Sequence, residues 1–581
     1  MQFAALFLAA VLAIPTAWAA GRDGEMVRVG LAYGSGALVN ANLENNTGYG
    51  SGYRLGYFDE DLDFVELART DEDETQITML KTQNTWVSGT SYSNSDNGGS
   101  VIGCYHVLME TGYRTYEQAA AAAAGYSGGF VAWVDGDYQV RVGAYPSESH
   151  AQSAAQSLGG TVVGTSSYGV NATRTGSTEI LFQFDGGADL ALGVMPDVTG
   201  AGSVRTWFKD YRYYGGFRYE RINGGNLTVV NIVDLETYIK GVIPYEMSNS
   251  WPLEALKVQA VCARSYAYIN IQSGKHTRYH FDVCNTTDCQ VYYGAGSRNS
   301  SYQANERTDQ AVDETAGEYA WYNGQVIEAF YSSSHGGASE SVYNVWGSSL
   351  SQYPYLCGVS DPYEADVADR NAYSSWTVSY TSEELAQRLQ NYGYNTSSGI
   401  ASLTLTYSEL GNVINVRVSY KNGQYNDITT KLTYGIRSSF DVPSIRFTVN
   451  GQGSTSGSGN NSGTGGGSLT VNGGSSLGLQ DSYTVIGGGG TQSQVALEDL
   501  YTISGSGSID PAGEGVSTGG GSSTDTPSGT QVTVSGSTYT FQGSGYGHQL
   551  GLSQYGALAM VERGFTYEEI IEFYYPGTYV Q

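Results

Sequence analysis

The sequence predicts an α+β fold, and three observations lead to that prediction. Residues 27–35 alternate apolar and polar side chains, as half-buried strands do. Residues 252–271 repeat apolar side chains at helical spacing. Between 105 and 163 a strand, an Ala-rich helix and a second strand occur twice in succession. Two such copies predict a small sheet with helices on one face, beside a larger mixed region.

Length and charge exclude several classes of function. A chain of 581 residues is long enough for several domains. Lys and Arg number 28 and Asp and Glu 56, so the net charge is 28 − 56 = −28, which argues against nucleic-acid binding. Gly (79) and Tyr (48) are in excess while charged residues are scarce. This composition fits an exported protein that acts on a neutral, hydroxyl-rich ligand such as a glycan.

The first 20 residues are apolar and end in Ala17-Trp18-Ala19, which is typical of a signal peptide with its cleavage site. An uncleaved membrane anchor is the alternative. No later stretch is apolar over the roughly 18 residues that a spanning helix needs. We therefore expect a protein outside the cytoplasm, either secreted or associated with the cell wall or membrane.

Composition divides the rest of the chain. The tract 451–530 is rich in Gly, Ser, Thr and Asn and predicts a flexible, low-complexity insertion. The expected parts are a signal peptide at 1–20, N-terminal strands at 21–100, the βαβ repeat at 101–175, a main domain at 203–450, the insertion at 451–530, and a C-terminal return to the main domain at 531–581.

The second copy of the repeat resembles a known domain. It reads YQVRVGAYPSESHAQSAAQSL, with Ser147 as a helix cap. This stretch resembles the SPOR domain, the sporulation-related repeat. The resemblance implies binding to peptidoglycan glycan strands that have lost their stem peptides. The alternative is a structural insertion without a binding function.

The segment 229–268 carries the clearest candidate for catalysis. It predicts a strand, a short helix at 235–241, a turn at Pro244 and a longer helix capped by Ser250. Lys257 and Arg264 are seven residues apart and so share one helix face. Glu246 is expected in the loop before that helix, where a carboxyl could act as an acid or base. The alternative is an ordinary surface glutamate near a helix N-terminus.

A dense string of residues in this segment resembles the SpoIID/LytB family, which includes the stage II sporulation protein D of endospore formers. The matching residues are Val230-Asn231, Asp234-Leu235-Glu236, Tyr238, Gly241-Val242, Glu246-Met247, Trp251-Pro252, Glu254-Ala255-Leu256-Lys257, Gln259-Ala260, Ala263-Arg264 and Tyr266. Later landmarks are Phe330-Tyr331-Ser332 with Gly336-Gly337, Val345-Trp346-Gly347, Gly543 to His548, and Gly551 to Ala557. Gln549 stands where the family usually has glycine, and Leu552 where it usually has methionine, which puts the local loop shape in question.

The resemblance implies a lytic transglycosylase. Such enzymes cleave the bond between N-acetylmuramic acid and N-acetylglucosamine without water and leave a 1,6-anhydro ring. Glu246 inherits the role of the catalytic acid and base, which requires a raised pKa. Lys257 and Arg264 match basic residues needed for activity, and a binding or electrostatic role suits them. The other expected substrate-binding residues are Tyr331, Ser332, Ser334, His335, Gly336, Gly337, His548 and Gln554.

A second hypothesis is a protein that binds without cleaving. Some relatives are described as amidase enhancers, which bind glycan and stimulate a cell-wall amidase. The intact Glu246 motif favours the enzyme. A zinc peptidase is the weakest hypothesis, because no HExxH motif is present.

A cluster of His and Cys residues follows the long helix. His276, His280, Cys284 and Cys289 lie within 14 residues and could form a tetrahedral zinc site. A Cys284–Cys289 disulfide is the alternative, although the odd total of five cysteines argues against a full disulfide framework. Some SpoIID relatives carry a His/Cys zinc site here, with a histidine directly before the second cysteine, a place taken by Asp288. We expect a structural zinc with Cys284, Cys289 and His276 as ligands and His280 or Asp288 as the fourth.

Overall fold

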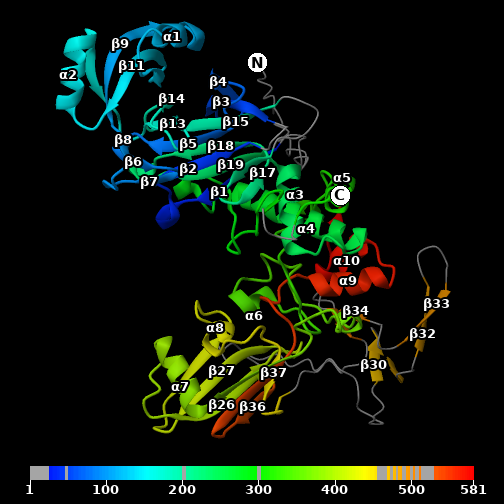
Figure 1. Ribbon diagram of the computed structural model, residues 1–581. Helices are drawn as coiled ribbons and strands as arrows, with labels where there is room; N and C mark the ends of the chain where they lie inside the picture. The colour runs from blue at the N-terminus through cyan, green and yellow to red at the C-terminus, as the bar shows by residue number, and fades with distance from the viewer. Residues whose placement is uncertain are drawn as a thin grey trace, which may run out of the picture.

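The computed structural model describes residues 25–45, 50–198, 205–297, 303–453 and 529–581, together with the backbone of short strands between 468 and 511. The fold is α+β, as predicted. Figure 1 shows sheets at both ends of the molecule and a group of helices between them. The expected signal peptide at 1–20 lies outside the described residues, as does most of the expected insertion at 451–530. No helix in the described ranges has the length and apolarity needed to cross a bilayer.

A seven-stranded sheet forms the base on which the helices pack. Its order is β20-β1-β19-β18-β15-β3-β4, and β19 pairs antiparallel with both β1 and β18. The apolar run in β19 is buried on both faces, which explains why it does not alternate. The strands are β1 (Met26–Ala32), β3 (Gly50–Phe58), β4 (Phe64–Arg69), β15 (Leu192–Val198), β18 (Gly216–Glu220), β19 (Thr228–Asp234) and β20 (Val283–Cys284).

The βαβ repeat is joined to a larger sheet. Its elements are β9 (Tyr105–Tyr113), α1 (Tyr116–Ala123), β10 (Gly129–Val134), β11 (Asp137–Tyr145), α2 (Glu148–Leu158) and β12 (Thr161–Gly164). Ser147 caps α2, as predicted. We expected a small separate sheet, but β10 pairs in parallel with β14 and so continues into an eleven-stranded sheet. This pairing satisfies backbone groups that an edge strand would leave open.

The eleven-stranded sheet has the order β12-β9-β11-β10-β14-β13-β5-β2-β16-β17-β21. Its remaining strands are β2 (Asn40–Glu44), β5 (Gln76–Lys81), β13 (Val170–Arg174), β14 (Ile180–Asp185), β16 (Thr206–Phe208), β17 (Tyr211–Tyr213) and β21 (Gly296–Ser297). A small sheet lies beside it, formed by β6 (Thr85–Ser88), β7 (Ser91–Ser93) and β8 (Ser100–Ile102).

The central helices come from two distant parts of the chain. They are α3 (Leu235–Glu246), α4 (Leu253–Ser273), α5 (Glu306–Glu314), α9 (Gln554–Glu562) and α10 (Tyr567–Tyr574). Short strands tie the two parts together: β22 (Ala320–Tyr322) pairs with β23 (Gln325–Val326) and β39 (Tyr579–Val580), and β24 (Tyr331–Ser332) pairs with β38 (Leu552–Ser553). Residues 327–330, between β23 and β24, form no ladder.

Helix boundaries differ from the sequence prediction at two places. Pro244 does not end α3, which continues to Glu246 and is closed by the Met247 N–H bonding to the Ile243 carbonyl at 2.9 Å. A proline in the last turn removes only one of the helix hydrogen bonds. Ser250 does not cap α4, because Pro252 occupies the N-cap position and the Ser250 hydroxyl meets that of Ser248 at 2.8 Å.

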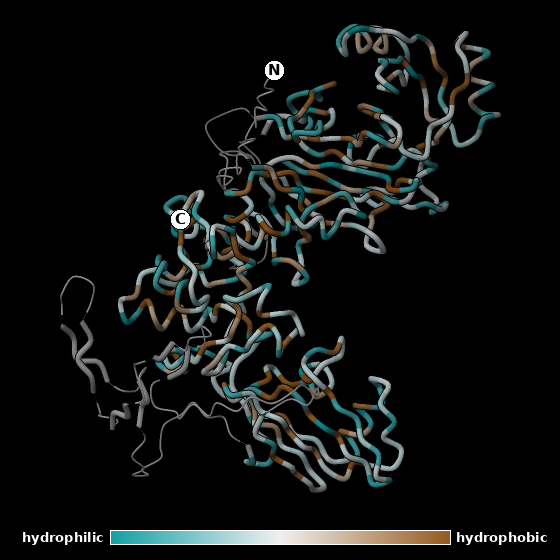
Figure 2. The backbone as a smooth tube through the Cα atoms, turned by 180° about the vertical axis from the view of Figure 1, so that it is seen from behind, coloured by the Kyte–Doolittle hydropathy of each residue, from teal (hydrophilic) through white to brown (hydrophobic). Residues whose placement is uncertain are grey.

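Two further sheets are formed by strands from residues 376–449 and 531–543. Their orders are β28-β27-β26-β36 and β25-β37-β29. The elements are α6 (Val342–Trp346), β25 (Trp376–Thr381), α7 (Ser382–Asn391), β26 (Ile400–Tyr407), β27 (Val413–Tyr420), β28 (Tyr425–Thr429), α8 (Ile436–Phe440), β29 (Phe447–Val449), β36 (Gln531–Val534) and β37 (Thr538–Gly543). Figure 2 shows hydrophobic residues concentrated in the strands at both ends of the molecule.

The described residues on either side of the long insertion both lie against Tyr407. A Cβ atom on Gly453 would meet the Tyr407 hydroxyl at 2.1 Å, and one on Gly529 would meet the Tyr407 carbonyl oxygen at 1.9 Å. Gly453 and Gly529, the described residues on either side of the insertion, are therefore both packed against Tyr407. Within that segment the backbone forms the paired strands β30 (Ser468–Val471) with β31 (Ser475–Gly478), β32 (Ser482–Ile486) with β33 (Gln492–Ala496), and β34 (Tyr501–Ile503) with β35 (Ile509–Pro511).

Candidate active site

Glu246 is the last residue of α3 and has only neutral hydrogen-bond partners. The Val291 N–H donates to Glu246 Oε1 at 3.3 Å, and the side chains of Tyr331 and Gln554 bond to the same carboxyl. Burial is the largest influence and raises the pKa of Glu246 to about 7, while these three bonds lower it. The C-terminal end of a helix also disfavours negative charge. A carboxyl in this setting is protonated near neutral pH and able to donate a proton.

The three partners of Glu246 come from distant segments. Val291 follows the cysteine loop, Tyr331 lies in β24, and Gln554 begins α9. Tyr331 pairs with Leu552 across the parallel β24–β38 bridge, which brings the C-terminal segment to the end of α3.

Two glutamines that we did not predict as site residues support these partners. Gln290 donates to the Tyr331 hydroxyl at 3.0 Å and accepts from the Tyr238 hydroxyl at 3.0 Å. Gln554 donates to Gln259 Oε1 at 3.2 Å, and Gln259 is fully buried in α4. Gln259 lies within the family-like string, whereas nothing in the sequence pattern indicated Gln290.

The loop 334–337 is hydrogen-bonded to the buried carboxylate of Glu364. Glu364 accepts from the backbone N–H of His335 at 2.9 Å, from that of Gly336 at 3.1 Å and from the Ser334 hydroxyl. Ser334 and His335 are completely buried. Both were expected to bind substrate, but the structure places them beneath the loop surface, where they support its shape. Glu364 was missed because it lies 30 residues away in an acidic stretch that matches no motif.

Ser332 and the two loop glycines have different surroundings. The Ser332 hydroxyl is buried and has no partner among the described residues. A Cβ atom on Gly336 would meet the Ser544 hydroxyl at 2.4 Å, and Gly337 lies against Arg446 with a φ of +122°. Packing and backbone conformation therefore require glycine at both positions.

The two histidines of the expected cleft are neutral and differ in their bonding. Burial lowers the pKa of His335 to about 3, and neither of its ring nitrogens has a partner in the described chain. Burial also lowers the pKa of His548 to about 4. His548 Nδ1 accepts the Leu550 N–H at 3.0 Å, and its ring also bonds to the Tyr331 backbone. His548 therefore links the C-terminal loop to the residue that contacts Glu246.

Gln549 keeps the backbone shape of the glycine that it replaces. Its φ is +65°, in the left-handed region that favours glycine and costs another residue about 1 to 3 kcal/mol. Its side chain accepts the Ile445 N–H at 3.0 Å and donates to the His335 carbonyl at 3.0 Å. These buried bonds offset the strain, so the departure from the family pattern leaves the loop shape intact.

Lys257 and Arg264 lie away from Glu246. Lys257 pairs with Glu254 at 3.0 Å and Glu314 at 2.8 Å. Arg264 has no exposed side-chain surface and forms a bidentate pair with Glu236 at 2.8 and 2.6 Å. A substrate-binding or electrostatic role was expected for Arg264. Its guanidinium is instead buried against the first turn of α3, at the other end of that helix from Glu246. Direct substrate contact by this residue is excluded by its burial.

The cysteine loop brings four candidate metal ligands together. The ligand atoms of His276, Cys284, Asp288 and Cys289 all lie within 4.8 Å of one another, and His276 Nε2 is 3.1 Å from Cys289 Sγ. Both cysteines are free thiols, so the alternative disulfide is not formed. Two thiolates, an imidazole and a carboxylate at this spacing fit a tetrahedral zinc ion.

His280 was predicted as a possible ligand and is not part of this cluster. It follows a short 3-10 turn, adopts a φ of +58° and directs Nδ1 to Glu220 Oε1 at 2.6 Å. The left-handed residue turns the chain away from the cysteines. Asp288 is the fourth member of the cluster.

Comparison with known proteins identifies part of the chain. Residues 223–322 match the family model SpoIID, described as stage II sporulation protein, and this segment contains Glu246 and the four candidate ligands. The resemblance to the SpoIID family is thereby confirmed for that segment. The matched segment does not include 105–163, where the likeness to SPOR domains stays a prediction.

Curated relatives cover larger parts of the chain. The amidase enhancer of Bacillus subtilis is 31% identical over 342 residues, which are 58% of this chain and 40% of that protein. The stage II sporulation protein D of the same organism is 29% identical over 186 residues, 31% of this chain and 52% of that protein. An uncharacterized protein of Brachyspira hyodysenteriae is 36% identical over 238 residues, 41% of this chain and 59% of that protein. The chain thus spans about half the length of these relatives.

Proposed function

Because residues 223–322 form a SpoIID segment that carries Glu246, we propose that this chain acts on the bacterial cell wall as a peptidoglycan lytic transglycosylase. The observation that carries the proposal is the state of Glu246. Its pKa is raised to about 7 by burial, and no cation contributes to that value. A single carboxyl that is easily protonated and deprotonated near neutral pH suits a reaction with one acid and base. A hydrolase, in contrast, usually needs a second carboxylate to act on water.

The proposed reaction uses Glu246 twice. Its carboxylic acid protonates the glycosidic oxygen that leaves C1 of N-acetylmuramic acid, and the C1–O bond breaks. The resulting carboxylate then accepts the proton of the sugar's own 6-hydroxyl as O6 forms a bond to C1. No water is consumed, and Glu246 ends protonated as it began.

The neighbours of Glu246 hold the carboxyl in place during this exchange. The Val291 N–H and the side chains of Tyr331 and Gln554 bond to it in its charged form without adding a full charge. They therefore stabilise the carboxylate that forms after the first step, yet leave the pKa high enough for that step to occur.

We further propose a structural zinc ion in the cysteine loop. Cys284, Cys289, His276 and Asp288 would hold it, and four protein ligands leave no position for a reacting water. The ion would supply rigidity and no chemistry. The residues that follow Cys289 are Gln290 and Val291, which reach Tyr331 and Glu246, so the cluster would fix one side of the active site.

A second candidate function is a glycan-binding protein that stimulates a cell-wall amidase without cleaving the glycan. The relative named amidase enhancer, which aligns with 58% of this chain, supports it. Under either function the expected ligand is a peptidoglycan strand, with stem peptides removed if the SPOR-like repeat binds as predicted, and the expected location is outside the cytoplasm.

Product analysis separates the two candidates. Purified peptidoglycan, intact and stripped of stem peptides, is incubated with the full chain and the soluble products are analysed by mass spectrometry. The transglycosylase releases fragments with 1,6-anhydro ends and no reducing ends. The binding protein releases no glycan fragments on its own, and instead increases the peptide release by an added amidase.

A further inference from the structure

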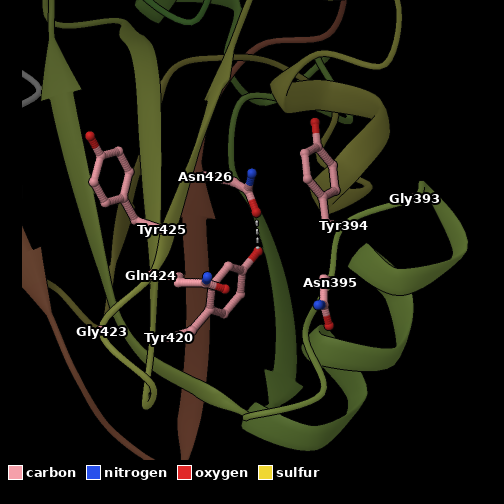
Figure 3. Close-up of a pocket in the computed structure, with 8 residues that line it drawn as sticks. All are labelled: Gly393, Tyr394, Asn395, Tyr420, Gly423, Gln424, Tyr425 and Asn426. Carbon is pink, nitrogen blue, oxygen red and sulfur yellow. Dashed lines mark hydrogen bonds between the residues drawn. The ribbon is translucent and has the colours of Figure 1, made fainter.

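A pocket of about 540 Å³ lies beside the sheet β28-β27-β26-β36, which contributes no residue to the Glu246 site. Figure 3 shows the pocket between the β27–β28 hairpin and the loop that follows α7. It is lined by three tyrosines, three amide side chains and two glycines, namely Tyr394, Tyr420, Tyr425, Asn395, Gln424, Asn426, Gly393 and Gly423. Its size is in the usual range of small-ligand pockets, which is roughly 300 to 1,000 Å³.

The two walls of the pocket are fixed by backbone hydrogen bonds. On the helix side, Gly393 has a φ of +89° and the Tyr394 N–H bonds to the Leu389 carbonyl at 3.2 Å, which closes the end of α7. On the hairpin side, the Tyr420 N–H bonds to the Gln424 carbonyl at 2.8 Å. A ligand would therefore meet a surface that is already formed and would spend little free energy on ordering it.

The amide groups of the pocket have unused donors. Asn426 Oδ1 accepts the Tyr420 hydroxyl at 2.8 Å, and Asn395 Oδ1 accepts the Ser397 hydroxyl at 2.8 Å. Gln424 Oε1 accepts from Asn422 at 3.3 Å. In each case the oxygen is engaged, while the NH₂ group donates to no other described residue. Three oriented NH₂ groups in one pocket are suited to bind carbonyl and hydroxyl oxygens of a ligand.

The aromatic side chains add flat surfaces without charge. Tyr425 is 55% exposed, but its ring lies with the Arg417 guanidinium, at 4.1 Å, on the face of the hairpin opposite to Asn426, so Tyr394 supplies the aromatic surface of the pocket. That guanidinium is also paired with Asp427 at 2.8 Å, so its charge is already matched. None of the eight lining residues carries a charge at neutral pH. Tyrosine rings beside neutral amides favour a ligand with apolar C–H faces and many hydrogen-bonding groups, which describes a sugar ring.

We propose that this pocket binds a neutral, N-acetylated sugar chain, with one ring seated against Tyr394, between the loop after α7 and the hairpin. The N-acetyl carbonyl and the ring hydroxyls accept hydrogen bonds from the amide NH₂ groups of Asn395, Gln424 and Asn426. Because this sheet contributes no residue to the Glu246 site, the pocket would retain a glycan strand at a second point. The inference does not rest on cleavage by Glu246, since binding here is measured without turnover.

Oxidative footprinting of the full chain tests the pocket directly. Hydroxyl radicals modify exposed tyrosines, and mass spectrometry reads the rate at each one. The probe is chitohexaose, the β-1,4-linked hexamer of N-acetylglucosamine, added to the Glu246→Gln chain so that no cleavage can occur. We expect saturating probe to slow oxidation of Tyr394 by about threefold or more, as burial of a ring in a complex does, while Tyr425, on the other face of the hairpin, should change little. Exposed Tyr168 and Tyr579 lie outside the pocket and should not change.

Two variants make the test specific. Asn395→Ala removes one NH₂ donor and should weaken protection of Tyr394 by up to about tenfold in probe concentration, the upper range for one net hydrogen bond. Tyr343→Ala removes an exposed tyrosine outside the pocket and should leave protection unchanged. Absence of protection at millimolar probe overturns the proposal, as does equal protection in the Asn395 variant. Protection by an unrelated neutral peptide but not by chitohexaose would overturn the ligand class. Release of 1,6-anhydro products is a separate measurement, so failure here leaves the function proposed for Glu246 unaffected.

Discussion

The two ends of helix α3 each present a glutamate, and their surroundings give them different properties. Glu236, in the first turn, forms a bidentate pair with the fully buried Arg264 and accepts the Gly317 N–H at 3.2 Å. Glu246, at the last residue, bonds only to neutral groups, and burial raises its pKa to about 7. The helix dipole favours a charge at the first position and opposes it at the last. One helix thus holds one glutamate that is paired with a buried arginine and stabilises the fold, and a second glutamate that can exchange a proton.

The largest expected effect is on the Glu246 side of this comparison. Glu246→Gln keeps the shape but removes the exchangeable proton, and a general acid typically supplies 10² to 10⁴-fold in rate. We expect the release of 1,6-anhydro products to fall by at least about that factor, measured by mass spectrometry. Glu74→Gln changes another buried carboxyl, in the segment just before β5, and serves as the control. Activity of the Glu246→Gln chain within threefold of wild type would contradict the proposed role.

Glu236→Gln tests the other end of the helix and should act on stability. It leaves the buried guanidinium of Arg264 without its charged partner, a change that costs on the order of 3 to 5 kcal/mol. We expect a clear drop in the melting temperature by calorimetry, whereas the product per folded molecule stays within a few-fold of wild type. A selective loss of rate without loss of stability would show that the two ends do not divide their tasks in this way.

A third prediction concerns pH. The folded protein holds the Glu246 proton up to about pH 7, while the unfolded chain releases it near 4.5. The folded state therefore binds more protons between these values, so the free energy of unfolding decreases as pH rises through this window, by up to ~3 kcal/mol, and levels off above it. Glu246→Gln should lack this decrease and be more stable than wild type at pH 8, with the difference vanishing toward pH 4. Urea unfolding at several pH values measures it.

The reaction rate should also depend on the protonated fraction of Glu246. Above about pH 7 the acid form of Glu246 is depleted, and the rate of anhydro-product release is expected to fall about tenfold per pH unit. A rate that rises with pH instead would indicate that Glu246 must be ionised at the start.

Removal of the proposed metal should loosen only the Glu246 end. Cys284→Ser is expected to abolish the roughly one zinc per chain measured by elemental analysis and to displace Gln290 and Val291. A shift of about 1 Å at a catalytic group costs up to on the order of 10²-fold in rate, and we expect about tenfold. Cys357→Ser, at an exposed cysteine outside the cluster, should keep both metal and rate. Hydrogen exchange should rise around 284–291 but not around Glu236, and metal-free wild-type protein would refute the site.

The smallest effect is expected for Tyr331→Phe. The hydroxyl bonds to the Glu246 carboxyl and lowers its pKa, so its loss should raise that pKa further. One hydrogen bond contributes about 0.5 to 1.5 kcal/mol. We expect a modest loss of rate together with a shift of the pH profile to higher pH. A lower rate with an unchanged profile would assign Tyr331 to substrate binding alone.

How far the sequence predicted the site depends on which atoms do the work. Glu246, Tyr331 and Gln554 belong to recognisable strings, so their meeting could be anticipated although they are 308 positions apart at most (554 − 246). The contact of the Val291 N–H with Glu246 could not be anticipated, because every residue except proline has a backbone N–H and the sequence does not show which one reaches the carboxyl. Arg264 was misplaced because helical spacing gives the face of a residue but not the depth at which that face is buried.

Individual secondary-structure elements were easier to predict than the pairing between distant strands. Capping by Ser147 followed from local chemistry and is present in the structure. The parallel pairing of β10 with β14 joins segments whose contact depends on the whole sheet, which periodicity does not encode. The exchange of His280 for Asp288 in the cysteine cluster likewise depended on a single left-handed residue.

The attachment of the insertion at Tyr407 has an evolutionary consequence. Gly453 and Gly529 lie against the same residue, so the rest of the fold experiences the intervening 75 residues (529 − 453 − 1) as a closed loop of arbitrary size. Each doubling of such a loop costs only about 0.6 kcal/mol in closure entropy. Slippage during replication of the Gly/Ser-rich codons could therefore lengthen or shorten this segment repeatedly while selection on the catalytic domain remained almost indifferent. Length at this point of the chain can therefore change at little cost to the rest of the described fold.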